Sequence, residues 1–177
     1  MSRLAFVVML ALFALPATAL GDDSKAAKIH RALSAAPGWL QAQAAVATFD
    51  THGNATVLQS GTNGFTCVPG TPGVVGDDPM CMDSQGMLFV KSLMAHAPKP
   101  ANTAPGVIYM LAGGSDYSVT NPWAMTGKMI YHDPPHWMIM WPFDPKKSGL
   151  RTRFSTSGTW VMWAGTPYAH LMIDQRP

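Results

Sequence analysis

The stretch TWVMWAGTPYAHLMI, residues 159–173, decides the fold. Two apolar runs, 159–163 and 168–173, flank a short AGTP segment, and a glycine-containing connection of this length is typical of a β-hairpin. A third run, HWMIMW at residues 136–141, has the same character. All three runs are apolar on both faces, so we expect these strands in the middle of a sheet or between two layers.

Outward from this hairpin, shorter segments predict the remaining elements. A helix is expected from Ser24 to about residue 36, and a clearer one follows Asp83 in SQGMLFVKSLMAHA, since Ser and Asp are common helix N-caps. Short strands are expected at residues 44–49, 55–58, 65–68 and 107–111, and AGGSDYS, residues 112–118, is expected to be a turn. The sequence therefore predicts an α+β fold: a mainly antiparallel β-sheet with one or two packed helices.

The first residues carry the pattern of a secretory signal peptide. MSR gives a positive start, residues 4–15 are apolar, and ATA at 17–19 is a small-residue cleavage site. The apolar run is shorter than the roughly 20 residues that a membrane helix needs, and no later run reaches that length. We therefore expect residues 1–19 to be cleaved and residues 20–177 to form a single periplasmic or secreted domain without a transmembrane segment.

Composition limits the class of partner. Charged residues make up 12% of the chain, every acidic residue is aspartate, and loss of residues 1–19 leaves 11 basic against 10 acidic residues. A nearly neutral protein has no long-range field that attracts polyanions, which argues against nucleic acid as a partner. A small ligand or a metal ion is the expected partner.

The two cysteines, Cys67 and Cys81, are expected to form a disulfide. They flank the Gly- and Pro-rich loop VPGTPGVVGDDPM, and an even cysteine count in an exported protein favours pairing over a thiolate metal site. Closing a loop of this length contributes about 3 kcal/mol. Within the loop, Asp77 and Asp78 are expected to belong to a solvated or capping turn.

Histidine and methionine recur at one spacing in two of the predicted strands. Side chains two residues apart share a face of a strand, so His136 lies with Met138, and His170 lies with Met172. Imidazole and thioether together suit copper, because the soft sulfur prefers Cu(I). The pattern therefore indicates a copper site with these four residues as ligands.

Two considerations weigh against that site. If the strand at residues 159–163 separates the other two, their axes lie about 9.6 Å apart, which is too far for one ion on a flat sheet. Buried histidines that are hydrogen-bonded in the core, with methionines filling gaps beside them, give the same sequence pattern. His132, in HDPPH, is four residues from His136, but Pro134 and Pro135 forbid the helix that would make the two a metal-binding pair.

Two other functions stay open. A small secreted hydrolase would use His136 or His170 as base with Ser115 or Asp116, although the nucleophile motif G-x-S-x-G is absent from AGGSDYS. A non-catalytic ligand-binding module would use a pocket walled by tryptophan and methionine.

Four segments, GTNGFTCVPG, DDPMC, YMLAGGSD and WVMWAGTPYAHLM, resemble motifs of an uncharacterised group of secreted bacterial hypothetical proteins. The resemblance spans residues 61–172, most of the expected mature chain. It implies that these segments form one shared fold that includes the cysteine loop and the PYAH hairpin. It carries no activity, substrate or cofactor over to this chain.

Overall fold

A computed structural model describes residues 24–51 and 53–174 of the chain. The expected signal peptide lies outside the described residues. The helices are α1 (Lys25–Leu33), α2 (Gly38–Gln41), α3 (Ser84–Met94) and α4 (Pro145–Ser148). The strands are β1 (Ala45–Phe49), β2 (Ala55–Gln59), β3 (Thr66–Val68), β4 (Met80–Met82), β5 (Gly106–Met110), β6 (Gly114–Asp116), β7 (Tyr131–Asp133), β8 (His136–Met140), β9 (Gly158–Met162) and β10 (His170–Asp174).

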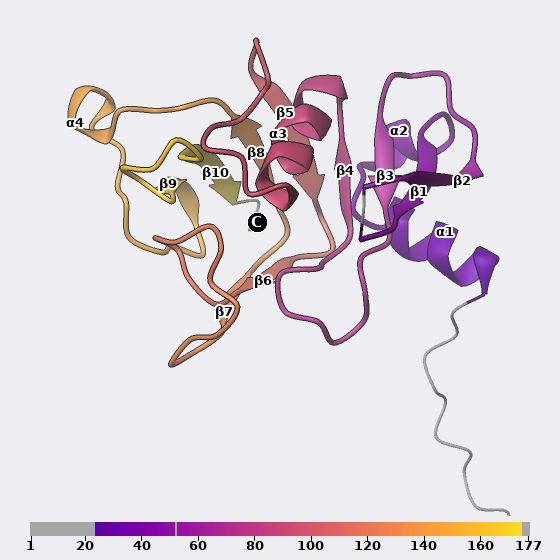
Figure 1. The fold of residues 1–177 in the computed structure, drawn as a ribbon, viewed down its shortest axis with the longest axis horizontal. Coiled ribbons are helices and arrows are strands. Elements are labelled where there is room, and N and C mark those ends of the chain that lie inside the picture. The colour runs from indigo at the N-terminus through magenta and orange to yellow at the C-terminus, as the bar shows by residue number, and fades with distance from the viewer. Residues whose placement is uncertain (1–23, 52, 175–177) are drawn as a thin grey trace, which may run out of the picture.

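Eight of these strands form one sheet in the order β2-β1-β3-β4-β5-β8-β10-β9 (Figure 1). Only β1 and β3 pair in parallel, and every other neighbouring pair is antiparallel. β6 and β7 form a separate antiparallel ribbon. The predicted α+β fold with a mainly antiparallel sheet is confirmed.

Helices cover the two faces of the sheet separately. α3 contacts β4, β5 and β8, whereas α1 contacts β1 to β4. Two consecutive residues of β4 show the division, because Cys81 belongs to the core under α1 and Met82 to the core under α3. Each helix buries its apolar side against one face, as an amphipathic helix on a sheet must.

Local sequence explains where the helices begin and how closely α3 lies. The Ser24 hydroxyl accepts a hydrogen bond from the Ala27 amide, and the Asp83 carboxylate accepts one from the Gly86 amide, so both expected N-caps are confirmed. Asp83 also accepts a bond from the Val107 amide of β5. A Cβ atom added at Gly106 would collide with the Gly86 backbone, so the two glycines allow α3 to lie directly on β5.

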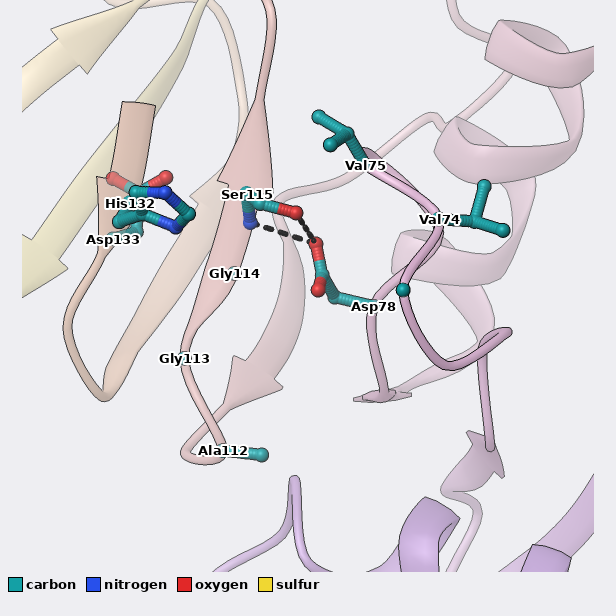
Figure 2. Close-up of a pocket in the computed structure, with 10 residues that line it drawn as sticks. Val74, Val75, Asp78, Ala112, Gly113, Gly114, Ser115, His132 and Asp133 are labelled. Atoms are coloured by element: carbon teal, nitrogen blue, oxygen red, sulfur yellow. Dashed lines mark hydrogen bonds between the residues drawn. The ribbon is translucent and has the colours of Figure 1, made fainter. Parts of the chain in front are cut away.

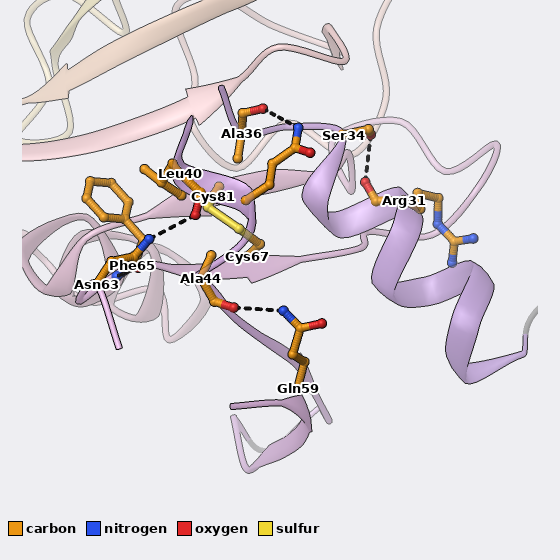
Figure 3. The surroundings of a disulfide bond; sticks show 11 residues. Arg31, Ser34, Ala36, Leu40, Ala44, Gln59, Asn63, Phe65, Cys67 and Cys81 are labelled. Carbon is orange, nitrogen blue, oxygen red and sulfur yellow. Dashed lines mark hydrogen bonds between the residues drawn. A yellow bond between two sulfur atoms is a disulfide. The ribbon is translucent and has the colours of Figure 1, made fainter. Parts of the chain in front are cut away.

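The predicted disulfide joins directly opposed residues of neighbouring strands. Cys67 of β3 and Cys81 of β4 are paired in the antiparallel register, and their sulfur atoms are bonded (Figure 3). Both residues are fully buried in the core beside Leu40 and Ala44. The bond closes the base of the loop between β3 and β4, whose tip forms a wall of the site described below.

Two expectations about local structure were wrong. AGGSDYS is not only a turn, since its residues 114–116 form β6, which pairs with β7. β4 was not expected, because three residues within a Gly- and Pro-rich loop carry too little periodicity to indicate a strand. In both cases the partner strand supplies the order, through backbone hydrogen bonds that local sequence does not encode. Within the part of the chain that the structure describes, no helix is long and apolar enough to cross a membrane.

Candidate functional site

The two histidine–methionine strands are direct neighbours. β10 lies between β8 and β9, so the concern that residues 159–163 separate the two strands was wrong. In the antiparallel register Met172 is opposite Met138, and Asp174 is opposite His136. Packing decides this order, since the hairpin β9–β10 can join the sheet through either of its strands.

The register places a pair of thioethers between two imidazoles. His136 precedes Met138 on β8 and His170 precedes Met172 on β10, and the two strands run in opposite directions. Each histidine is therefore roughly 7 Å along its own strand from the opposed methionines, and the two histidines lie at opposite ends of the methionine pair. All four side chains are buried on the face under α3, where at most 6% of each residue is exposed.

Both imidazoles are held by the backbone two residues upstream. The His136 Nδ1 atom lies 2.8 Å from the Pro134 carbonyl oxygen, and the His170 Nδ1 atom lies 2.9 Å from the Tyr168 carbonyl oxygen. A carbonyl oxygen only accepts, so Nδ1 carries the proton in each ring. Each neutral imidazole consequently presents the lone pair of Nε2, which is the form that binds a metal ion.

Burial keeps both rings neutral. Burial lowers the pKa of His170 to about 4, and a positive charge on His136 would also lower this pKa. The hydrogen bond to the Tyr168 carbonyl acts in the opposite direction. Burial also lowers the pKa of His136, partly offset by its bond to Pro134 and by the charge of Asp78. Because a charged imidazole is poorly solvated in such a core, both histidines are uncharged at neutral pH.

A cavity of about 100 Å³ lies among these side chains. Both histidines line it, beside Phe89 and Trp163, whose rings pack edge-on against His170. Six methionines line the same cavity: Met80, Met110, Met138, Met140, Met162 and Met172. The sequence also placed Met140 on the same face as His136 and Met138, and offered Met162 as a contributor from the neighbouring strand. Met80 of β4 and Met110 of β5 were not expected at the site.

A larger cleft of about 440 Å³ adjoins this inner cavity on the solvent side. One wall is the loop between the two cysteines, with Val74, Val75 and Asp78, and the other is the β6–β7 ribbon (Figure 2). Asp78, Gly114, Ser115 and Asp133 line both spaces. We refer to the two spaces as the inner cavity and the outer cleft.

The β6–β7 ribbon brings aspartates to the junction of the two spaces. Burial first, then the charges of Asp133 and Asp78, raise the pKa of Asp116 to about 8. Burial, then the charges of Asp174 and Asp78, raise the pKa of Asp133 to about 7. Both pKa values are thus raised toward neutral pH, mainly because burial disfavours an ionised carboxylate and secondly because of the neighbouring aspartates.

Ser115 contacts a carboxylate instead of an imidazole. Its hydroxyl donates to Asp78 Oδ2 at 2.9 Å, and its amide donates to the same oxygen at 2.7 Å (Figure 2). Asp78 was expected in a solvated or capping turn, and its carboxylate is not merely solvated, because it accepts these two hydrogen bonds from a residue 37 positions away. Among the described residues no hydrogen bond joins Ser115 to a histidine, and the hydrolase alternative stays a prediction.

The remaining candidate residues lie around the site in different ways. His132 is exposed and lines the outer cleft but not the inner cavity, so it does not join His136 and His170. Trp163 lines the inner cavity, while Trp160 is fully buried and lies directly opposite Met172 in the neighbouring strand. Trp137 points to the opposite face, toward Tyr109. These three tryptophans therefore serve mainly in packing, whereas Trp141, which was expected in a buried strand, is 37% exposed.

The chemistry available at the site is set by the mixture of these groups. In residues 24–51 and 53–174, no three His, Cys, Asp or Glu side chains converge on one point that could hold a metal ion. The inner cavity instead combines two neutral imidazoles with thioethers, and the outer cleft combines carboxyl groups with two valines. Searches of known family models, of curated proteins and of solved structures found nothing that matches this chain.

Proposed function

We propose that this is a periplasmic or secreted copper-binding protein that holds Cu(I) in the inner cavity. His136 and His170 bind through Nε2, and Met138 and Met172 bind through sulfur. The observation that carries the proposal is that two neutral imidazoles and six methionines line one buried cavity. Thioether sulfur is a soft ligand that favours Cu(I) over harder divalent ions.

The positions of the four ligands support one shared ion. Met138 and Met172 are opposite each other, and one histidine lies beyond each end of that pair. The Nδ1 hydrogen bonds to Pro134 and Tyr168 fix the plane of each ring, which is the usual outer-shell support for a metal-binding histidine. An ion beside the methionine pair therefore has one imidazole on either side.

The cavity itself argues against a purely structural role for the methionines. Flexible methionine side chains usually fill irregular gaps in a core. Here they surround an unfilled space of about 100 Å³, whereas roughly 10–15 Å³ in the same measure is enough for one water molecule. Methionines retained only to fill space would close that gap.

The site also suits the compartment that the sequence predicts. The buried disulfide between Cys67 and Cys81 fits an oxidising, extracytoplasmic location. Thioethers keep their affinity for copper where free thiols are oxidised. Copper handling outside the cytoplasm is therefore the role that we assign to the cavity.

The test is the copper content of the mature, untagged protein, purified from an export host without chelators and then loaded with Cu(I). We expect close to one copper per chain, and loss of that copper in the His136→Ala/His170→Ala variant. The matched control is His30→Ala/His96→Ala, since both of these histidines are exposed and line neither space. A folded wild-type protein that takes up no copper overturns the proposal.

A further inference from the structure

The junction between the outer cleft and the inner cavity contains one buried carboxyl oxygen without a hydrogen-bond partner among the described residues. Asp133 is 6% exposed, and its Oδ1 atom is buried with no hydrogen-bond partner among the described residues. The residue lines both spaces. Buried polar groups in native proteins are almost always hydrogen-bonded, so an exception at a cavity wall points to a missing ligand group.

The surroundings of Asp133 are negative. The charged groups that act on these carboxyl groups are other aspartates: Asp133 and Asp78 act on Asp116, and Asp174 and Asp78 act on Asp133. Within the described residues, no lysine or arginine lines the outer cleft or the inner cavity. The histidines of the inner cavity are neutral, as shown above. A bound cation would therefore stabilise the ionised form of these carboxyl groups.

The shape of the outer cleft indicates an organic cation in preference to a bare ion. Its volume of about 440 Å³ lies within the range of roughly 300–1,000 Å³ that is usual for small-molecule sites. Asp78 and Asp133 come from different walls and do not form a three-residue metal-binding group. Val74 and Val75 add an apolar wall (Figure 2).

The wall that carries Asp78 is held in place before any ligand arrives. The Ser115 hydroxyl and amide both donate to Asp78 Oδ2, which orients that carboxylate across the cleft. The loop is closed on itself by a bond from the Thr71 amide to the Asp77 carbonyl, 2.8 Å long, and at its base by the disulfide. Such preorganisation reduces the entropy lost on binding.

We propose that the outer cleft binds a small primary amine with a short apolar chain. The ammonium group pairs with Asp133 and Asp78, and the apolar chain lies against Val74 and Val75. This site is independent of the copper proposal, because it uses none of the four copper ligands and is present in the metal-free protein. The two sites share only the wall between them, where Gly114 lies next to both Asp78 and His136.

The experiment is a titration of metal-free, ¹⁵N-labelled mature protein with n-butylamine at pH 8, followed by NMR. n-Butanol, butyrate, Mg²⁺ and Ca²⁺ serve as parallel probes. We expect saturable shifts with n-butylamine, confined to residues 70–79 and 112–116 and to β7, and none with the neutral or anionic analogues. Asp133→Asn and Asp78→Asn should each weaken binding at least tenfold.

The matched control is Asp77→Asn, because Asp77 is exposed in the same loop and lines neither space. It should bind n-butylamine as the wild type does. Equal shifts with n-butanol, unchanged affinity in a folded Asp133→Asn or Asp78→Asn variant, binding of Mg²⁺ or Ca²⁺ without the amine, or no shifts at all would each overturn the proposal. Asparagine is nearly the same size as aspartate, and the wild-type shift pattern tests the location of the site even where one variant does not fold.

Discussion

Met138 of β8 and Met172 of β10 lie directly opposite each other on one buried face of the sheet. The two residues are 34 positions apart in the sequence, and only the pairing of their strands brings their sulfur atoms to one cavity. A histidine two residues before each of them lies at either end of the pair. This relationship turns a repeated spacing into a candidate copper site.

Replacing both methionines with leucine separates metal binding from packing. Leucine has a similar volume but no sulfur, and such swaps usually cost less than about 1.5 kcal/mol each. Met138→Leu/Met172→Leu should bind Cu(I) at least tenfold more weakly, as measured by competition with a chromogenic Cu(I) chelator, while urea unfolding changes little. Met94→Leu/Met125→Leu is the control, since both methionines are exposed. Unchanged Cu(I) affinity in the buried variant would exclude the methionine pair as ligands.

Asp116 should make the protein less stable as the pH rises toward 8. Its pKa is raised from the ordinary 3.8 to about 8 in the folded state. Between these values the unfolded chain has released a proton that the folded chain retains, so the free energy of unfolding falls with rising pH. The contribution is complete below pH 3.8 and is lost as the pH passes 8.

Asp116→Asn removes this titration. Relative to wild type, the variant should gain stability between pH 5 and pH 9, because the asparagine side chain has no proton to release over this range. Urea unfolding at the two pH values measures the difference. Asp77→Asn, at an exposed position, should show no such gain. A constant difference between Asp116→Asn and wild type at all pH values would contradict a raised pKa.

The disulfide should support both global stability and the outer cleft. Cys67→Ala/Cys81→Ala removes the disulfide, which joins residues 14 positions apart. Loss of a disulfide that closes a loop of this length lowers the free energy of unfolding by about 3 kcal/mol. Urea unfolding of the variant and of the wild type, without reductant, checks the magnitude. Since the same loop carries Asp78 and Val74, n-butylamine should also bind more weakly to the folded variant. Full amine affinity without the disulfide would show that the loop is held by its other contacts.

A methyl group at Gly106 should push α3 away from β5. The added Cβ would collide with the backbone of Gly86, which has no flexible end to move aside. Gly106→Ala should therefore lower the free energy of unfolding by about 1–3 kcal/mol, as overpacked core sites do. Gly38→Ala is the matched control, because nothing lies within 4 Å of the position of its added Cβ. Similar unfolding midpoints for the two variants would contradict the close packing of α3.

Much of the local structure could be predicted because it depends on nearby residues. The N-caps Ser24 and Asp83, the β9–β10 hairpin and the alternation of β8 all follow from short-range patterns, and each is present in the structure. β4 and the β6–β7 ribbon were missed. Those strands are three residues long, and they are ordered by partners whose position the local sequence does not report.

The sequence alone determined which residues share a face: His136 with Met138, and His170 with Met172, because side chains alternate along any strand. It also determined the pairing of the only two cysteines. Tertiary structure alone decided that β8 and β10 are neighbours, that Met80 and Met110 line the same cavity, and that Ser115 meets Asp78. The reason is physical: strand order and cavity walls are set by which apolar faces pack together, and that choice depends on the whole chain at once.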